Sequence, residues 1–421
     1  MRRKRILRQV IIGNSAAGLA AATAIRRQDP LSLLTIISEE DCPAYSRVLT
    51  TYFLKGNIDK GQLQYCDLSF YGERNIQPFL GHRAMAIDVQ RQRVILDRGK
   101  PIPYDNLLIA TGASPAFPSV PGMDHRGVFG LRTIADAEEI HAWCEKVREV
   151  VILGAGLVSL QVADALLPRN LKITLIVKSP QVLSQLLDPE GASFIEGAMK
   201  QRGIRILKGR DVQEIRCDSN GSVCEVLLDD DQSISAQMVV VGKGVQPNID
   251  LLEGAGIHTK SGILVDERMR TNIHHIYAAG DVAEGFDFLT GERKISAIWP
   301  TAAAQGEIAG ISMTGFPSHY GGFISRNVTH LFGLETAVLG LARARGQPFD
   351  IATHSDPEGK VYRRLVLEEG RLVGASLIGR IRDAGILHSL IRTRRVLGPL
   401  TNQSIRFPLN WGRFLTGRQS T

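Results

Sequence analysis

The stretch VIIGNSAAGLAAA, from Val10 to Ala22, joins a hydrophobic run to a glycine-rich bend and then to a helical pattern of small residues. The same order returns in VVILGAGLVSLQVADAL, from Val150 to Leu166. In such a bend a strand reverses into a helix whose first free backbone N–H groups face a pyrophosphate, and a side chain would keep the phosphate away. Two bends of this kind in one chain predict two bound dinucleotides.

Two further segments complete the pattern. TNIHHIYAAGDVAE, from Thr271 to Glu284, brings Asp281 directly after small residues, where a carboxylate suits a sugar hydroxyl. Together with LLIATGASP, from Leu107 to Pro115, the order of the motifs resembles that of the flavin-dependent pyridine nucleotide oxidoreductases built like glutathione reductase. In that family the first bend binds FAD and the second binds NAD(P)H, so the resemblance implies both cofactors.

The resemblance also implies an α/β fold with two Rossmann-like dinucleotide-binding domains and a small α+β C-terminal domain. The 421 residues, 44% of them hydrophobic, are enough for two or three compact domains. Clusters of proline and glycine at 113–122 and 241–247 mark crossings, so we expect the second domain to be inserted into the first. The predicted domains are 1–115 with 245–320 for FAD, 116–244 for NAD(P), and 321–421 at the C-terminus.

The first bend departs from the usual glycine pattern at its middle position, where Ser15 stands. Serine is small and donates a hydrogen bond, so FAD binding is still expected. Glu39, after the next predicted strand, is placed to accept hydrogen bonds from the adenosine ribose, although Glu40 could take that part. The FAD-binding residues that the resemblance implies are Gly13, Ser15, Ala16, Ala17, Gly18, Glu39, Arg47, Thr111, Gly112, Gly280, Asp281 and Trp299.

The second bend keeps two glycines, and the resemblance implies that Gly154, Gly156 and Ser159 bind NAD(P)H. The next strand, KITLIVKSP, should end in an acid if it bound the ribose diol of NADH, yet it ends in Val177 and Lys178. The missing acid removes a repulsion against a 2′-phosphate, and Lys178 either attracts that phosphate or is a solvated surface residue. The choice between NADH and NADPH stays open.

The cysteines separate branches of the family. None of the five cysteines forms a C-x-x-C pair, and reduced thiols in a reducing compartment are expected. Peroxidases and coenzyme A disulfide reductases of similar architecture use one cysteine beside the flavin, and that position falls here on Val48. Cys42 lies six residues too early. A thiol mechanism is therefore disfavoured unless Cys42 folds back to the flavin.

The segment Pro43-Ala44-Tyr45-Ser46-Arg47 resembles the P-Y-D/S-R segment of ferredoxin reductases, rubredoxin reductases and the flavin half of NADH-dependent nitrite reductases. The resemblance implies that Arg47 lies near the FAD, and that Trp299 lies by the isoalloxazine. Many thiol-free reductases also carry a lysine and a glutamate near the nicotinamide, where Tyr52 and Gln161 stand here. Because the lysine and the glutamate are both replaced by neutral residues, neither charge is left buried without its partner. How the nicotinamide is held stays open, and no catalytic residue is predicted.

The formal net charge is +7, and the chain ends in a basic segment. From Ile381 onward Asp383 is the single acid, among Arg382, Arg392, Arg394, Arg395, Arg406, Arg413 and Arg418. Such a segment can steer an acidic protein electron carrier or a partner redox subunit, or it is simply solvated. No nucleic-acid recognition motif accompanies the charge.

The N-terminal MRRKR could begin a secretory signal, but cleavage would destroy the first bend, so a cytoplasmic protein is expected. No apolar run reaches the ~18–20 residues that span a bilayer. The oligomeric state stays open, and a homodimer is one possibility. His274 and His275 lack companion ligands, so no metal is predicted.

The sequence therefore predicts an FAD-dependent NAD(P)H oxidoreductase that takes hydride from NAD(P)H and passes electrons to a protein redox carrier such as ferredoxin, rubredoxin or a partner subunit. Two alternatives remain. One is a thiol-independent NAD(P)H oxidase, and the other is a flavoprotein relay subunit without nicotinamide chemistry.

Overall fold

The computed structural model describes residues 6–397 and 405–406, and the chain divides into two compact units. The first unit comprises residues 1–50, 58–114 and 245–323. The second comprises residues 51–57, 115–244 and 324–421. The N-terminal MRRKR and two arginines of the basic C-terminal segment, Arg413 and Arg418, lie outside the described residues. The predicted division into three domains stays a proposal.

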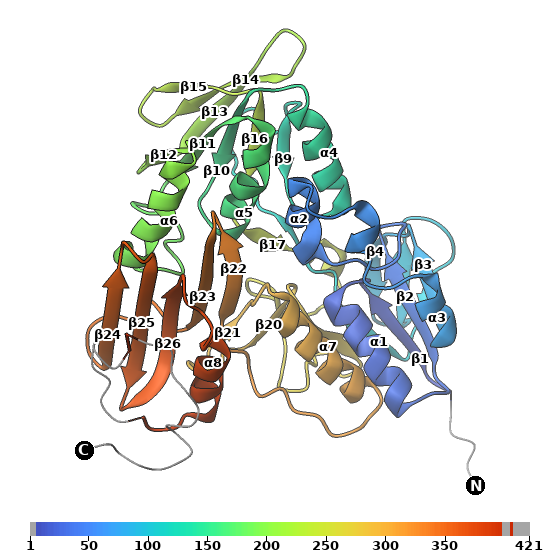
Figure 1. The fold of residues 1–421 in the computed structure, drawn as a ribbon. Helices are drawn as coiled ribbons and strands as arrows, with labels where there is room; N and C mark the ends of the chain where they lie inside the picture. The colour runs from blue at the N-terminus through green and yellow to red at the C-terminus, as the bar shows by residue number, and fades with distance from the viewer. Residues whose placement is uncertain (1–5, 398–404, 407–421) are drawn as a thin grey trace. The chain divides into compact units, whose positions relative to one another are not determined.

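The first unit is built on a five-stranded parallel sheet in the order β19-β7-β1-β2-β3 (Figure 1). Its central strands are apolar and buried, as expected where both faces of a parallel sheet are covered. The strands are β1 (Arg8–Ile12), β2 (Leu33–Ser38), β3 (Ile76–Leu80), β7 (Asn106–Ile109) and β19 (Ile276–Ala278). The crossing segments pair as β8 (Ala113–Pro115) with β17 (Val245–Pro247).

Two helices of the first unit lie against each other, α1 (Ala16–Gln28) and α7 (Trp299–Met313). Small residues allow this close approach. A Cβ built on Gly306 would clash with the carbonyl oxygen of Ala17, and one built on Gly310 would lie 2.5 Å from that of Ala21. The unit also contains α3 (Leu68–Glu73), β4 (Ala84–Asp88), β5 (Arg93–Leu96), β6 (Ile102–Pro103), β18 (Ile263–Leu264), β20 (Ala283–Phe286) and β21 (Arg293–Lys294).

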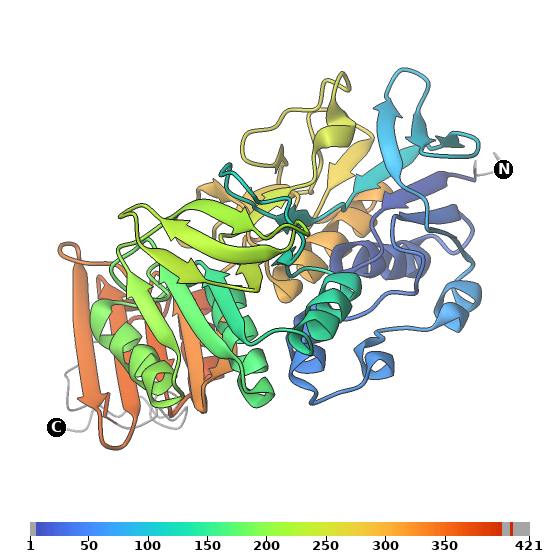
Figure 2. The ribbon, with the colours of Figure 1, turned by 90° about the horizontal axis from the view of Figure 1, so that it is seen from above.

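The second unit contains another five-stranded parallel sheet, in the order β12-β11-β10-β16-β9. Alternate residues face opposite sides. Val150 and Ile152 pack with the helices, whereas Val151 and Leu153 pack with a three-stranded antiparallel sheet on the other face. Figure 2 shows this small sheet, in yellow-green, lying over the parallel strands. The elements are β9 (Val128–Gly130), α4 (Ile134–Cys144), β10 (Glu149–Leu153), α5 (Leu157–Leu166), β11 (Lys172–Val177), α6 (Pro189–Gln201), β12 (Arg205–Lys208), β13 (Val212–Cys217), β14 (Val223–Leu228), β15 (Ser233–Ser235) and β16 (Met238–Val241).

The last part of the second unit is an antiparallel sheet in the order β22-β23-β26-β25-β24, followed by α8 (Ala384–Thr393), drawn in orange and red in Figure 1. Inside it the fully buried Arg363 is paired with Asp383 at 2.6 Å, which satisfies two buried charges at once. The strands are β22 (Arg326–Leu331), β23 (Leu334–Gly340), β24 (Phe349–Asp356), β25 (Val361–Glu368) and β26 (Arg371–Ile378). The predicted α/β fold class, with a C-terminal α+β element, is confirmed.

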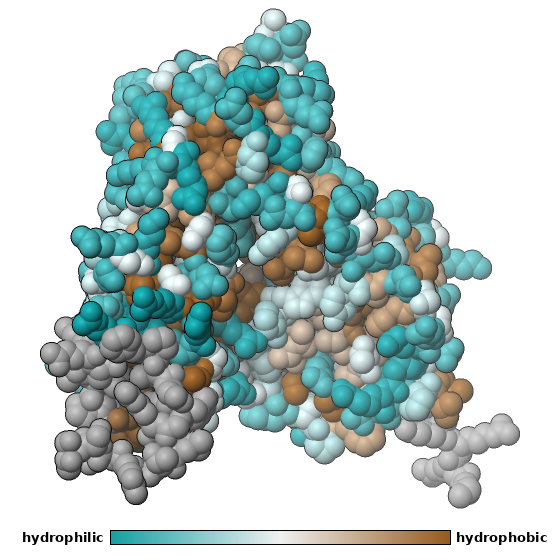
Figure 3. All heavy atoms as spheres, viewed as in Figure 1, coloured by the Kyte–Doolittle hydropathy of each residue, from teal (hydrophilic) through white to brown (hydrophobic). Residues whose placement is uncertain are grey.

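The face drawn in Figure 3 is mainly hydrophilic, with hydrophobic side chains in small patches. No helix within the described residues is long and apolar enough to cross a membrane.

Candidate functional site

The first glycine-rich bend lies at the carboxyl ends of β1, β2 and β7, where ligands bind in open α/β sheets. The Gly13 N–H donates to the Ile37 carbonyl at 2.8 Å, and Gly13 has a φ of +122°. A Cβ on Gly13 would clash with the carbonyl oxygen of Ala110, and a Cβ on Gly18 would clash with the carbonyl oxygen of Gly13. The protein's own packing therefore requires glycine at both positions.

Helix α1 presents its N-terminus at this bend. Ser15 is the N-cap residue, and its side chain makes no capping hydrogen bond within the part of the chain that the structure describes. The first turn, with the buried Ala16 and Ala17, carries no acidic residue. Its backbone N–H groups and the positive end of the helix dipole thus suit a phosphate group.

The structure separates the two glutamates that follow β2. Glu39 comes directly after the strand, its side chain is 69% exposed, and its carboxylate lies 3.6 Å from the Arg83 guanidinium. Glu40 is engaged within the protein, because it accepts hydrogen bonds from Tyr45, at 2.5 Å, and from Arg47. This geometry favours Glu39 for a ribose.

Arg47 begins the short 3-10 helix η1 (Arg47–Leu49). Its guanidinium pairs with Glu40, donates to the Tyr45 hydroxyl at 3.1 Å, and lies over the Tyr45 ring at 5.2 Å. The arginine is therefore held in one orientation by two residues of its own loop. Sequence reasoning named Arg47 but missed both partners.

Thr111 and Gly112 follow β7, where the chain leaves the first sheet. Both are hydrogen-bonded to Asn248, which follows β17, where the chain returns to this unit. Thr111 donates to the Asn248 carbonyl at 2.8 Å, and the Asn248 side chain donates back to the Thr111 carbonyl at 3.0 Å. The Asn248 N–H also donates to the carbonyl oxygen of Gly112, and Gly112 has a φ of +69°. The Gln246-Pro247-Asn248 run is the signal by which this residue could have been found.

Asp281 follows β19 and is buried. Before it, Gly280 has a φ of +82° and donates to the Gln305 side chain at 2.8 Å. A Cβ on Gly280 would lie 3.2 Å from the Ala17 Cβ and 3.5 Å from the Ala302 Cβ. The small residues of this motif thus place Asp281 beside the first bend.

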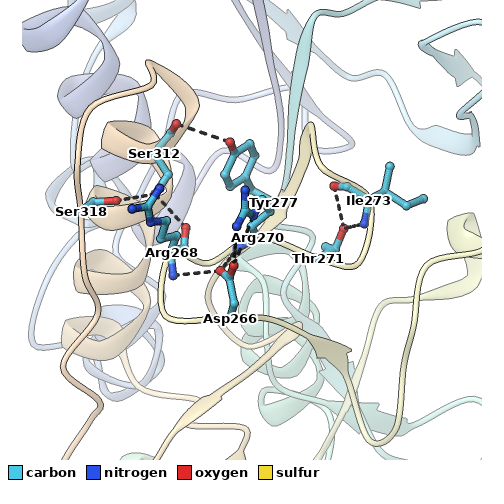
Figure 4. A network of polar contacts seen from close by, with 8 residues as sticks. All are labelled: Asp266, Arg268, Arg270, Thr271, Ile273, Tyr277, Ser312 and Ser318. Atoms are coloured by element: carbon cyan, nitrogen blue, oxygen red, sulfur yellow. Dashed lines mark hydrogen bonds and ion pairs between the residues drawn. The ribbon is translucent and has the colours of Figure 1, made fainter.

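A polar network holds the loop that leads into this motif (Figure 4). The Asp266 carboxylate accepts from the backbone N–H groups of Arg268 and Arg270, each at 2.9 Å, and from the Arg270 side chain. Ser312 of α7 donates to the Arg268 carbonyl at 2.8 Å, and the Tyr277 hydroxyl donates to the Ser312 carbonyl at 3.4 Å. These contacts tie the strand before Asp281 to helix α7.

Trp299 is the first residue of α7, and its ring lies 5.4 Å from that of Tyr65. The sequence did not reveal Tyr71, which donates to the side chain of Asn14 in the first bend at 2.9 Å. The Tyr71 hydroxyl also accepts from the Ala44 N–H at 3.2 Å. Burial raises the pKa of Tyr71 to about 12, so it stays protonated and acts as a neutral brace for the bend.

The thiols do not match a flavin-linked nucleophile. Val48, at the position of the redox cysteine, is 55% exposed. Burial raises the pKa of both Cys42 and Cys66, so neither is activated as a thiolate. All five cysteines are free, and no group of metal ligands was found among the described residues.

The second bend repeats the geometry at the end of β10. Gly154 has a φ of +99°, and a Cβ there would lie 2.5 Å from the Gly242 carbonyl oxygen. Ser159 is buried and donates to the same oxygen at 3.0 Å. Gly156 differs, because a Cβ built on it would meet no described atom within 4 Å. It is the exposed N-cap of α5, so the approach to this helix end is open.

The two neutral positions, Tyr52 and Gln161, have a charged counterpart nearby. Gln161 donates to Thr329 at 3.2 Å, and Tyr52 is exposed. Three residues further along each helix, Lys55 of α2 (Thr50–Lys55) pairs with Asp164 of α5 at 2.7 Å. Positions 52 and 161 themselves carry no charge, and this ion pair lies about one helical turn further along.

Asp164 also accepts from the backbone N–H of the buried Phe332 at 3.1 Å, so it joins three segments of the second unit. We expect Asp164→Ala to lower the free energy of unfolding by about 2–3 kcal/mol, because it leaves a buried N–H unpaired and an ammonium without its partner. Lys55→Met keeps most of the apolar stem and should cost about 1 kcal/mol. Urea unfolding of both variants tests this order, and equal small losses would show that the Phe332 hydrogen bond contributes little.

The chain is similar to known proteins over most of its length. Residues 7–306 match the family described as pyridine nucleotide-disulphide oxidoreductase. The chain is 30% identical to the NADH-dependent phenylglyoxylate dehydrogenase subunit epsilon of Aromatoleum evansii, over 96% of each chain. It is 30% identical to an NADH oxidase of Methanocaldococcus jannaschii, over 90% of this chain and 89% of the relative.

Among solved structures, a ferredoxin reductase from Rhodopseudomonas palustris superposes with a TM-score of 0.83 at 26% identity. The match covers 90% of this chain and 92% of that one. The expected cofactors, FAD and NAD(P)H, are those of this family. With two glycine bends at the ends of two parallel sheets, the chain belongs to the pyridine nucleotide-disulphide oxidoreductase family.

Proposed function

We propose that the protein oxidises NAD(P)H at its FAD and delivers the electrons to a protein redox carrier or a partner subunit. The observation that carries the proposal is the pair of helix N-termini, of α1 and α5, each at the carboxyl edge of its own parallel sheet. When bound, FAD accepts hydride from the nicotinamide and releases electrons to the acceptor. The protein's part is to hold and orient the two nucleotides.

For FAD, the proposed contacts all come from the first unit. The α1 N-terminus, with Ser15, Ala16 and Ala17, would hold the pyrophosphate, while Gly13 and Gly18 allow the bend. Glu39 would accept from the adenosine ribose, and the buried Asp281 from a sugar hydroxyl. The remaining proposed contacts are Arg47, Thr111, Gly112, Gly280 and Trp299. The tight bend and the uncapped helix end fit the group.

For NAD(P)H, the proposed contacts come from the second unit. The α5 N-terminus at Gly156 would hold the coenzyme pyrophosphate, and Gly154 and Ser159 fix the bend through the Gly242 carbonyl. The space around the Gly156 Cα is open in the described structure, and a side chain there would occupy the place proposed for the pyrophosphate.

A protein acceptor is supported by the thiols and by the relatives. No cysteine stands at position 48, and burial raises the pKa of Cys42 and Cys66. One relative is a subunit of a dehydrogenase, and the structural neighbour reduces a ferredoxin. The NADH oxidase relative favours oxygen as the second candidate acceptor. We further propose an acidic carrier drawn by the positive net charge, a cytoplasmic location consistent with the free thiols, and a homodimer.

The decisive experiment is anaerobic stopped-flow mixing of the yellow protein with NADH and then with NADPH, following flavin absorbance. Rapid bleaching by either coenzyme is expected, followed by reoxidation on adding a ferredoxin or rubredoxin. Reoxidation by oxygen alone, at a rate that sustains turnover, would favour the oxidase. No bleaching by either coenzyme would leave the relay subunit as the correct description.

The two glutamates after β2 give a paired test of the FAD site. Glu39→Gln should weaken FAD binding about 10- to 150-fold, because a charge-assisted hydrogen bond to the ribose contributes about 1.5–3 kcal/mol. Glu40→Gln should change FAD affinity much less, since Glu40 faces Tyr45 and Arg47 and a glutamine oxygen can still accept a hydrogen bond from Arg47 and keep its orientation. Fluorescence titration of the apoprotein with FAD measures both constants. A larger loss for Glu40→Gln would reverse the two roles.

A further inference from the structure

The second parallel sheet lacks an acid where a dinucleotide-binding strand usually supplies one. Strand β11 ends at the buried Val177, and the next residue, Lys178, has a side chain that is 81% exposed. In a Rossmann unit this position lies beside the adenosine ribose of the coenzyme. Side chains that other strands bring to this position therefore decide whether the site prefers the 2′-hydroxyl of NADH or the 2′-phosphate of NADPH.

A carboxylate comes to this position from the neighbouring strand. Arg210, which follows β12, donates its N–H to the Val177 carbonyl at 3.2 Å, so Asp211 stands next to the end of β11. The Asp211 carboxylate lies 3.3 Å from the Lys178 ammonium. It also accepts from the Val212 N–H at 2.9 Å, which fixes the orientation of the side chain.

A second lysine shares this carboxylate. Lys243 follows β16 and Gly242, at the same edge of the sheet, and its ammonium contacts Asp211 directly. Burial pushes the pKa of Asp211 up, but the hydrogen bond and charge of Lys243 outweigh it, so the pKa lies below its ordinary range. Asp211 is thus a carboxylate at neutral pH and is bonded to both cations.

We propose that Asp211 makes this protein selective for NADH over NADPH. The carboxylate would accept hydrogen bonds from the ribose diol of NADH, in place of the acid missing at the end of β11. At the same time it occupies Lys178 and Lys243, the two cations that a 2′-phosphate would need, and it repels that phosphate. The inference rests on the proposed coenzyme site in this unit.

Calorimetric titration of the FAD-loaded protein with 5′-ADP and with 2′,5′-ADP tests this selectivity without hydride transfer. The wild-type protein should bind 5′-ADP at least tenfold more tightly than 2′,5′-ADP. Asp211→Asn should reverse the preference, with a gain of tenfold or more for 2′,5′-ADP that shrinks as salt is added. Asp211→Ser serves as the second variant, because its hydroxyl can still accept from the Val212 N–H.

Asp230→Asn is the matched control, because Asp230 pairs at 2.5 Å with Arg210, the residue before Asp211, and contacts neither lysine in the described contacts. It should leave both affinities within twofold of wild type. If NADH bleaches the flavin but both Asp211 variants keep the wild-type ratio of affinities, the inference is wrong and the proposed function stands. If neither probe binds and neither coenzyme bleaches the flavin, the coenzyme site itself is wrong.

Discussion

Replacing Gly156 with valine is expected to leave a folded, yellow protein whose flavin is reduced by NADH at least 100-fold less efficiently. A Cβ at this position would meet no described atom within 4 Å, and the backbone φ of −77° is ordinary for any residue. The protein itself therefore tolerates the side chain, apart from about 1 kcal/mol for a poorer N-cap. The coenzyme pyrophosphate would not, because its approach to the α5 backbone is then blocked.

The measurement is the dependence of the flavin reduction rate on NADH concentration under anaerobic conditions. FAD content and the midpoint of urea unfolding are recorded on the same preparations. Gly197→Val is the matched control, because Gly197 also has free space around its Cβ but lies inside α6. Wild-type reduction by the Gly156 variant would mean that the second bend does not receive the pyrophosphate.

The sequence predicted the parts of the fold that depend on local pattern. A buried apolar strand, a glycine bend and a helix are neighbours along the chain, so Val10 to Ala22 and Val150 to Leu166 could be read directly. The α/β class and the placement of both bends at sheet edges follow from that reading. The cofactors followed from the resemblance.

The rest depends on contacts between residues far apart in sequence. The neutral Tyr52 and Gln161 were noticed, but the pair of Lys55 and Asp164 was not, since the helix faces that meet are fixed by packing. Asp211 is likewise separated from Lys178 by a helix and a strand. The engagement of Glu40 by Arg47 also needed the structure, because two adjacent carboxylates look equivalent in a sequence.

Gly18→Ala is expected to destabilise the protein itself, unlike the substitution at Gly156. At Gly18 the protein's own packing, and not the ligand, excludes a side chain. A Cβ on Gly18 would clash with the carbonyl oxygen of Gly13 and would lie 3.3 Å from Ile11. The bend cannot easily yield, since Gly13 is bonded to Ile37 on one side and packed on Ala110 on the other. Overpacking of this kind typically costs about 1–3 kcal/mol, and more where the backbone cannot move.

We therefore expect the Gly18 variant to lose most of its FAD, measured as the ratio of flavin to protein absorbance, and to unfold at lower urea concentration. Gly72→Ala, in α3 of the same unit, is the control. A Cβ there meets no described atom within 4 Å, and alanine should stabilise the helix by about 0.5–1 kcal/mol. If the Gly18 variant keeps its FAD and stability, the bend is looser than its contacts indicate. If only FAD is lost and stability is kept, then the ligand and not the protein sets the requirement at Gly18.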